Sequence, residues 1–439
     1  MAKIFLIILT GICTSLFIYP FNPSILPAAN TKMVLAVIGL ATLGYSLSTK
    51  REALFDKQIF ILSIFALLVS FVGFISMCYN ETPDTTYASY VMSMWVWLGA
   101  AYLVTKVIHF THGHISVELI CYYLIAVSTA QTILAITIDN VPAVKNLVDA
   151  MMVGEGFMGA NDSRLYGLGC ALDVAGSRFA ATLVMIAFLI PREMQKTGNK
   201  LVITLLFLCL GTITIIGNMM ARTTILGVAV AFLYLFYATC YTKGFSRAIR
   251  VQIMQYTCIY ILLFSSATAL AYKTNSQMRE NIRFAFEGFF SLVEKGYWET
   301  NSNNILQNMV KWPDNDKTWI IGDGYFDNPE KQDPHYTGPQ NRTAFYQGTD
   351  IGYCRFIFYF GIVGLLTFSA FIIRAALTCA NRLPQYRYLF LWIMALNFIV
   401  WSKVASDMFM VLAPFLCIAA SDQEEYENSL EANEQAEVY

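Results

Sequence analysis

The sequence predicts an all-α, polytopic membrane protein of about twelve transmembrane helices, with one large extracytoplasmic loop that carries short helices. Three observations lead to this fold class. Of the 439 residues, 56% are hydrophobic and only 13% are charged, whereas soluble domains carry about a quarter charged residues. Apolar stretches long enough to cross a bilayer recur along the chain. A long polar stretch, Lys273 to Thr349, interrupts them near the C-terminal end.

The apolar stretches define the expected transmembrane helices, which need roughly 17–25 mainly apolar residues each. They lie at residues 3–21, 32–48, 58–78, 87–106, 115–137, 174–191, 200–217, 222–241, 251–272, 351–373, 386–403 and 405–420. Because the second is short and the last two nearly touch, the expected count is about ten to twelve. The first is similar to a signal peptide, but Asn22-Pro-Ser-Ile-Leu-Pro is a poor cleavage site. We therefore expect it to be retained.

The short loops indicate the orientation of the chain. Lysines and arginines fall in the second, sixth, eighth and tenth loops, and none falls in the first or third. Since basic loops stay in the cytoplasm, both chain ends are expected there. Residues 1–272 then hold nine transmembrane helices, residues 273–349 form the large outer loop, and residues 350–420 hold three more helices. An acidic tail, residues 421–439, is expected to be solvated.

The large loop shows its own pattern. Apolar residues recur at helical spacing after Ser276, the expected N-cap, and before Gly296, the expected stop; they are Met278, Ile282, Phe286, Phe289 or Phe290, and Val293. This helix could lie in the plane of the membrane interface or pack on the transmembrane helices. A second helix is expected around Ile305–Val310. Trp319-Ile-Ile predicts an extended piece that ends in a tight turn at Gly322-Asp-Gly.

Three arginines lie on the expected outer side, against the general charge pattern. Arg222 lies at the outer end of one transmembrane helix, and Arg164 and Arg178 flank the entrance of another. Charges at membrane depth usually pair or serve a substrate pathway. A guanidinium group matches the geometry of phosphate oxygens, so a pyrophosphate on a lipid carrier is a natural ligand. The alternative is that each arginine extends to water or to lipid headgroups at the interface.

Asp350 opens the first transmembrane helix after the large loop. It could cap the free N–H groups of that helix. It could instead accept a proton from a sugar hydroxyl. Farther along, Lys403 and Asp407 could pair with each other, because they lie four residues apart.

The motifs of metal sites are missing from the sequence, and neither a metal nor a cofactor is expected. There is no HExxH motif and no paired set of histidines and cysteines. Asp314-Asn-Asp316 has the form of a motif that holds a metal and a nucleotide sugar. That form is short, and nucleotide sugars are cytoplasmic whereas this loop is expected outside, so we set it aside.

With these segments in view, the chain resembles the O-antigen polymerase and O-antigen ligase superfamily of bacterial inner-membrane glycosyltransferases, nearer the polymerase side. The resemblance covers roughly residues 160–370 and rests on short segments in a fixed order. They are Arg164-Leu-Tyr-Gly-Leu-Gly, Ala221-Arg-Thr-Thr-Ile-Leu-Gly227, Gly322-Asp-Gly-Tyr325, Thr349-Asp-Ile-Gly-Tyr353 and Phe360-Gly-Ile-Val-Gly364. Ligases of the group usually carry a histidine where this chain has Asp350, and His335 lies fifteen residues upstream.

The resemblance implies a metal-independent, inverting glycosyl transfer at the outer face of the bacterial inner membrane. The donor would be an oligosaccharide on undecaprenyl pyrophosphate, and the acceptor a sugar hydroxyl of a second lipid-linked unit. Arg222, helped by Arg164 or Arg178, would bind the pyrophosphate, and Asp350 would act on the acceptor hydroxyl. Further expected partners are membrane lipid and a chain-length regulator, with no nucleic acid.

Two other functions compete with polymerisation. One is a ligase that transfers the glycan to the lipid A core. The other is a flippase for lipid-linked oligosaccharides, since many transmembrane helices and few charges suit a transporter equally well. Transporters usually contain two similar halves. The sequence shows no such repeat, and its large polar loop lies in one half only.

Overall fold

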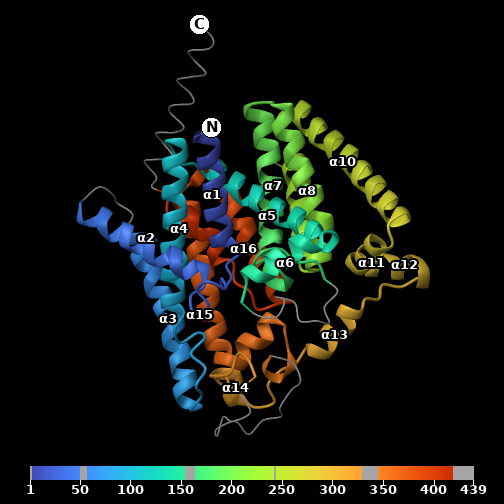
Figure 1. Cartoon of the computed structure of the whole chain (residues 1–439). Helices are drawn as coiled ribbons and strands as arrows, with labels where there is room; N and C mark the ends of the chain where they lie inside the picture. The colour runs from blue at the N-terminus through green and yellow to red at the C-terminus, as the bar shows by residue number, and fades with distance from the viewer. Residues whose placement is uncertain (1, 50–56, 154–163, 242–243, 329–344, 419–439) are drawn as a thin grey trace.

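The all-helical class of this membrane protein is confirmed by a computed structural model (Figure 1), and no strand occurs in the part of the chain that it describes. The described residues are 2–49, 57–153, 164–241, 244–328 and 345–418. The acidic tail, His335 and most of residues 154–169 therefore lie outside the described residues.

Eight of the described helices are long and apolar enough to cross a membrane. They are α2 (Thr31–Ser48), α3 (Lys57–Tyr79), α4 (Tyr90–His112), α5 (Val117–Asn140), α7 (Leu172–Lys196), α8 (Lys200–Met220), α10 (Arg247–Thr274) and α15 (Gly352–Arg382). Shorter helices occupy the other expected positions, namely α1 (Ala2–Ile18), α9 (Thr224–Cys240), α16 (Arg387–Trp401) and α17 (Phe409–Leu416). The expected count of twelve transmembrane helices is thus not confirmed, because these four are short.

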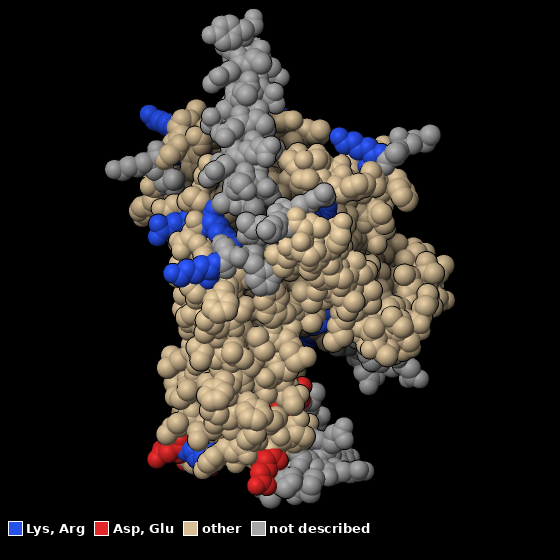
Figure 2. All heavy atoms as spheres, turned by 90° about the vertical axis from the view of Figure 1, so that its left-hand side faces the viewer, with Lys and Arg blue, Asp and Glu red and all other residues tan. Residues whose placement is uncertain are grey.

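Charged residues separate along the long axis of the bundle. Figure 2 shows most Lys and Arg of the visible face in its upper part, at the end where α1 begins, whereas Asp and Glu lie toward the lower end, with some basic side chains beside them. The polar segment after α10 extends toward that lower end (Figure 1). This separation agrees with the charge pattern from which the sequence predicts the orientation.

The core of the bundle is built around α7. In its apolar stretch, 94% of the residues are buried. Small residues permit this position: a Cβ atom on Gly227 of α9 would lie 2.1 Å from the Cα atom of Ala180, so the two backbones touch. Close backbone approach at small residues is the usual way in which membrane helices pack.

The large loop is mostly helical among its described residues. It contains α11 (Ser276–Ala285), α12 (Glu287–Lys295), α13 (Asn301–Met309) and α14 (Asp316–Ile320); before it, α6 (Pro142–Met151) lies in the loop after α5. The expected helix is therefore divided at Phe286. Gly296 ends α12 in the left-handed conformation, as predicted, with φ 81°.

Two local predictions for this loop are wrong. The N-cap of α11 is Asn275 rather than Ser276, because the Asn275 side chain accepts a hydrogen bond from the N–H of Met278. Trp319 lies in α14 rather than in an extended piece, since Asn315 caps this short helix by accepting from the N–H of Thr318. The glycine turn that follows is confirmed by the positive φ angles of Gly322 and Gly324.

One part of this loop packs on the transmembrane helices, and another part is exposed. Ile282 of α11 is buried against the transmembrane helices, whereas Val293 of α12 is 85% exposed. The expected packing on the transmembrane helices is therefore seen for the α11 part, and the arrangement in the plane of the membrane interface stays a prediction. The α11 part packs on the bundle, and the α12 part leaves an apolar face open.

A break in α15 at Phe360 and Gly361 fixes the N-terminal part of that helix. At Gly361, φ is 67°, and a Cβ atom there would lie 2.1 Å from the carbonyl oxygen of Ile320. The backbone N–H groups of Asp323 and Gly324 donate to the carbonyl oxygens of Phe358 and Tyr359, which the break leaves free. The glycine turn therefore inserts into the break and holds the segment that begins at Asp350.

Candidate functional site

The first cationic site lies where the link between α8 and α9 meets the junction of α11 and α12. Nη1 of Arg222 forms an ion pair of 2.9 Å with Oε2 of Glu287. The guanidinium carbon of Arg222 lies 4.0 Å from the centre of the Phe284 ring, and that of Arg164 lies 5.3 Å from the same ring. Two of the three predicted arginines thus meet on one phenylalanine side chain.

Glu287 supplies a negative charge beside Arg222 in this site. Burial lowers the pKa of Arg222, Glu287 opposes this effect, and the positive charge of Arg164 lowers the pKa further. Nε of Arg222 is buried without a hydrogen-bond partner. A guanidinium group matches the geometry of phosphate oxygens, so Arg222 is suited to bind them.

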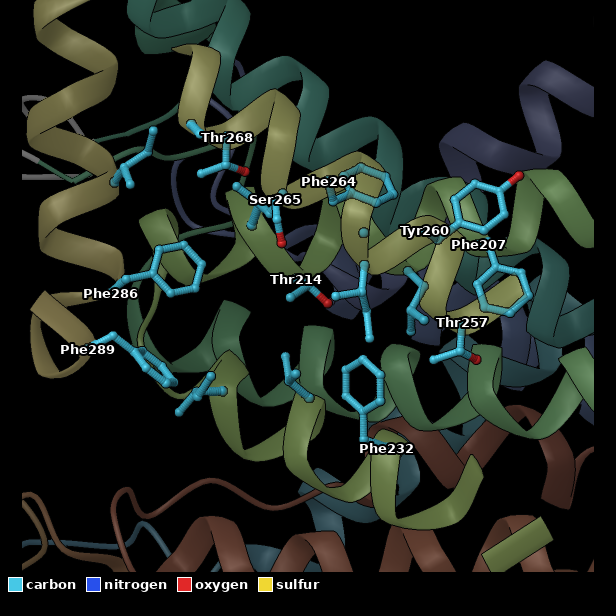
Figure 3. Close-up of a pocket in the computed structure, with 18 of the residues that line it drawn as sticks. Phe207, Thr214, Phe232, Thr257, Tyr260, Phe264, Ser265, Thr268, Phe286 and Phe289 are labelled. Carbon is cyan, nitrogen blue, oxygen red and sulfur yellow. The ribbon is translucent and has the colours of Figure 1, made fainter. Parts of the chain in front are cut away.

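An apolar groove of about 800 Å³ runs beside this site, between α8, α9, α10 and the α11–α12 region (Figure 3). This volume lies in the usual range for small-molecule sites. Its aromatic and hydroxyl lining includes Phe207, Thr214, Phe232, Tyr260, Phe264 and Phe286. One wall is α10, which packs loosely, with 6% of its apolar stretch buried. The groove can therefore accept a long apolar chain.

The groove and the arginines are built on the same segments, although neither Arg164 nor Arg222 is one of the residues that line the groove. Phe284, which both arginines contact, lies between Ile282 and Phe286 in the chain, and these two residues line the groove. Ile225, one helical turn after Arg222, also lines it. A ligand with an apolar tail and an anionic head fits this combination.

Arg178 lies in a different environment, inside the bundle. It is only 5% exposed, and its guanidinium carbon lies 5.7 Å from the centre of the Tyr19 ring. Its Nε has no hydrogen-bond partner. Asp407, in the link between α16 and α17, belongs to the same part of the bundle, where Ser177 of α7 hydrogen-bonds Ser406 at 3.0 Å. Burial raises the pKa of Asp407, and the positive charges of Lys32 and Arg178 oppose this rise.

Asp350 lies beside an arginine on the first turn of α15. Oδ1 of Asp350 is 3.9 Å from Nη1 of Arg355, and the Asp350 side chain is 21% exposed. Arg355 also donates a 2.6 Å hydrogen bond to Asp327 and lies 3.6 Å from the centre of the Phe326 ring. The N-cap of α15 is Ile351, without a side-chain hydrogen bond of its own. The Asp350 carboxylate lies beside the Arg355 cation and is partly exposed.

Several residues of these sites escaped sequence reasoning. Lys32 was overlooked because it is the first residue of an expected transmembrane segment, just beyond the loop that lacks basic residues. Arg355 could have been found from the sequence, since it is a charge inside an expected transmembrane segment. No feature of the sequence marked Glu287 as a site residue. Asp407 does not pair with Lys403; it accepts hydrogen bonds from Tyr90 and from the N–H of Phe409.

The described residues contain no group of three or more His, Cys, Asp or Glu side chains that could hold a metal ion. The middle residue of Asp314-Asn-Asp316 caps α14. Comparison with known proteins finds no protein-family model and no curated protein that matches this chain. Fold and site together define a helical membrane protein with a pair of arginines and an apolar groove built on the same segments.

Proposed function

We propose that this protein is a membrane glycosyltransferase that polymerises lipid-linked repeat units of a surface polysaccharide. The observation that carries the proposal is the apolar groove whose walls belong to the same helices and loop that hold the Arg164 and Arg222 site. A polyprenyl chain fits the groove, and the pyrophosphate that it carries fits the arginines. The groove and the arginines support a polyprenyl pyrophosphate as the ligand. The resemblance of short motifs to the O-antigen polymerase and ligase superfamily supports glycosyl transfer as the reaction.

The proposed reaction follows from these parts. The hydroxyl oxygen of the acceptor sugar attacks the anomeric carbon of the donor glycan. The bond between that carbon and the pyrophosphate oxygen breaks, and undecaprenyl pyrophosphate leaves with the electron pair. Arg222 and Arg164 stabilise the negative charge that develops on the leaving group. Asp350 accepts the hydroxyl proton.

The position of Asp350 supports this role. A general base must be able to reach the acceptor, and Asp350 lies at the start of α15 with its Oδ1 3.9 Å from Nη1 of Arg355. The side chain is partly exposed, so a substrate can approach it. A carboxylate here, rather than the histidine usual in ligases, favours the transfer of one repeat unit to another over transfer to the lipid A core.

The test is reconstitution of the full chain in liposomes with a defined lipid-linked repeat unit. We expect polymer ladders from the wild type. Arg222→Ala should abolish the ladders and leave single repeat units, because the leaving pyrophosphate loses its main cation. Arg283→Ala is the matched control, since Arg283 is an exposed arginine of the same loop that pairs with Glu294.

The same assay separates the competing functions. Transfer of the glycan to added lipid A core, without ladders, would identify a ligase. Movement of the lipid-linked unit across the bilayer without any new glycosidic bond would identify a flippase. Normal ladders from Arg222→Ala would refute the assigned role of Arg222.

A further inference from the structure

Helix α12 presents an apolar face that is largely exposed. Phe289, Leu292 and Val293 lie on one side of the helix, because they are spaced three and four residues apart, and their exposed fractions are 53%, 46% and 85%. After the helix ends, Trp298 returns to this face. Its ring is 50% exposed and lies 5.0 Å from the ring of Phe289, edge to face. These four large apolar side chains form one surface, which we call the α12 patch.

The opposite face of α12 is charged. Glu287, Glu294 and Lys295 lie on it, since they are separated from one another by about two helical turns or by one residue at its edge. Glu294 pairs with Arg283 of α11 at 2.8 Å, and Lys295 pairs with Glu299 at 2.6 Å. A helix with large apolar residues on one face and charged residues on the other is typical of a segment that lies in the plane of a membrane interface.

The α12 patch continues the exposed surface of α10. Leu270, about one turn before the end of α10, is 64% exposed. The two helices touch through their rings, because Tyr272 of α10 stacks on Phe290 of α12 at 5.5 Å. Phe289 of the patch lines the groove together with Thr268 of α10. The apolar surface of a helix long enough to cross the membrane therefore passes directly onto α12.

This continuity favours bilayer lipid as the occupant of the patch. Only 6% of the apolar stretch of α10 is buried, so the bilayer covers the rest of it. In Figure 1, α11 and α12 lie at the lower end of α10, at the edge of the bundle. A chain that leaves the bilayer at this point lies at the depth of the lipid headgroups. Tryptophan is enriched at that depth, because its ring is apolar while its N–H can reach water.

The same helix holds part of the arginine site. Glu287, the first residue of α12, forms the ion pair with Arg222. Phe286, Phe289 and Phe290, at the start of α12, line the groove. A helix that is anchored in the membrane interface therefore fixes the depth of both the groove and Arg222 relative to the lipid headgroups.

We propose that the α12 patch inserts into the bilayer at the boundary between headgroups and acyl chains, so that α12 lies parallel to the membrane surface. The leaflet is the one on the side of the large loop, which is the outer leaflet in the expected orientation. This surface is distinct from the groove, since Phe289 is the only member of the patch that lines the groove. The inference does not depend on the proposed reaction, because a polymerase, a ligase and a flippase would all keep the same anchor.

Tryptophan fluorescence of the full chain in phosphatidylcholine nanodiscs tests the depth of the patch. The chain has 7 tryptophans, so the signal of Trp298 is taken as the difference between the wild type and Trp298→Phe. Lipid brominated close to its headgroup should quench this signal strongly, and lipid brominated close to the ends of its chains should quench it less. Iodide, which stays in water, should quench it weakly.

Trp312 is the matched control, because it belongs to the same loop and is 52% exposed. It lies between α13 and α14, which extend beyond α12 toward the lower end of the molecule in Figure 1. Its signal, obtained with Trp312→Phe, should show the reverse order, with strong quenching by iodide and weak quenching by brominated lipid. Because the two rings are almost equally exposed, the comparison reports what surrounds each ring. Equal quenching of both rings by iodide would overturn the proposal.

A charge in the patch should release α12 from the bilayer. Val293→Asp removes no packed side chain, since Val293 is 85% exposed, so the thermal midpoint in detergent should stay at the wild-type value. The quenching of Trp298 by brominated lipid should fall by more than half, and its quenching by iodide should rise. Gln307→Asp adds the same charge at an exposed residue of α13 and should change neither. Unchanged quenching in Val293→Asp would contradict the insertion of this face.

Photochemical crosslinking identifies the occupant directly. A benzophenone amino acid replaces Val293 in the full chain, and the adducts formed in nanodiscs are identified by mass spectrometry. We expect adducts with phosphatidylcholine. Adducts with a second copy of the chain, together with a Trp298 signal that neither quencher reduces, would overturn the proposal and identify the patch as a dimer interface.

Discussion

Helices α7 and α10 are both long and apolar enough to cross a membrane, yet they occupy opposite environments. In their apolar stretches, 94% of the α7 residues are buried, compared with 6% of those in α10. On the contact face of α7, Gly176 and Ala180 let neighbouring backbones approach. On α10, the aromatic rings keep the helix at a distance: Tyr260 stacks on Phe207 at 4.9 Å, and the Phe264 ring fills the space beside Gly211.

This difference shows that insertion of a helix into the membrane and its position within the bundle depend on different properties. Apolarity is sufficient for a helix to enter the membrane, but the size of its contact residues decides whether it lies at the centre or the edge. The central helix carries the buried cation Arg178. The edge helix is separated from α8 and α9 by rings, and the space that remains is the apolar groove.

The largest effect should come from filling the contact between α7 and α9. Gly227→Val would place a side chain on the backbone of Ala180 and should cost roughly 3 kcal/mol of stability or more. The thermal midpoint of the purified protein in detergent measures this loss. Gly44→Val is the matched control, because no atom lies within 4 Å of a Cβ at Gly44. Equal midpoints for the two variants would disprove the backbone contact.

A large loss of activity should follow removal of the Asp350 carboxylate. Asp350→Asn keeps the shape of the side chain but removes its basicity, so polymer formation should fall by about 100-fold to 10,000-fold, the usual contribution of a general base. Initial rates in the reconstituted system measure the loss. Asp314→Asn, at an exposed carboxylate of the same loop, should keep the wild-type rate. A drop in both variants would point to a general effect of charge on the outer face.

A smaller effect is expected from blocking the groove at the edge. Thr214→Trp would fill part of the space that a polyprenyl chain needs, and we expect an increase of about tenfold in the Kd for undecaprenyl pyrophosphate, about 1.4 kcal/mol. Leu262→Trp places the same side chain on α10 at a residue that is 67% exposed and does not line the groove. Similar Kd values for the two variants would rule out the groove as the lipid site.

The smallest effect concerns the loop that inserts into the break in α15. Asn315→Ala removes the side-chain acceptor at the start of α14 and should cost about 1 kcal/mol. The thermal midpoint should shift by a few degrees, and the activity should persist after addition of a chelator. Loss of activity on chelation would instead revive a metal role for Asp314-Asn-Asp316.

Local features of the sequence account for the predictions that succeeded. Helices in the membrane follow from apolar length, the end of α12 follows from Gly296, and the turn at Gly322 and Gly324 follows from the need for positive φ angles. The errors were also local. Asn275 and Asn315 cap the two helices, because their side chains accept hydrogen bonds from free N–H groups in the first turn. The apolar spacing alone does not show where these helices begin.

The sequence alone therefore determined the class of this protein, a helical membrane protein with a folded polar loop, because apolar length and backbone preference act within a few residues. Only the tertiary structure decided the sites. Arg164 and Arg222 meet on Phe284, and Tyr90 of α4 donates a hydrogen bond to Asp407, through the packing of helices far apart in the chain. Such pairings depend on which helix faces match, and no local pattern records that choice.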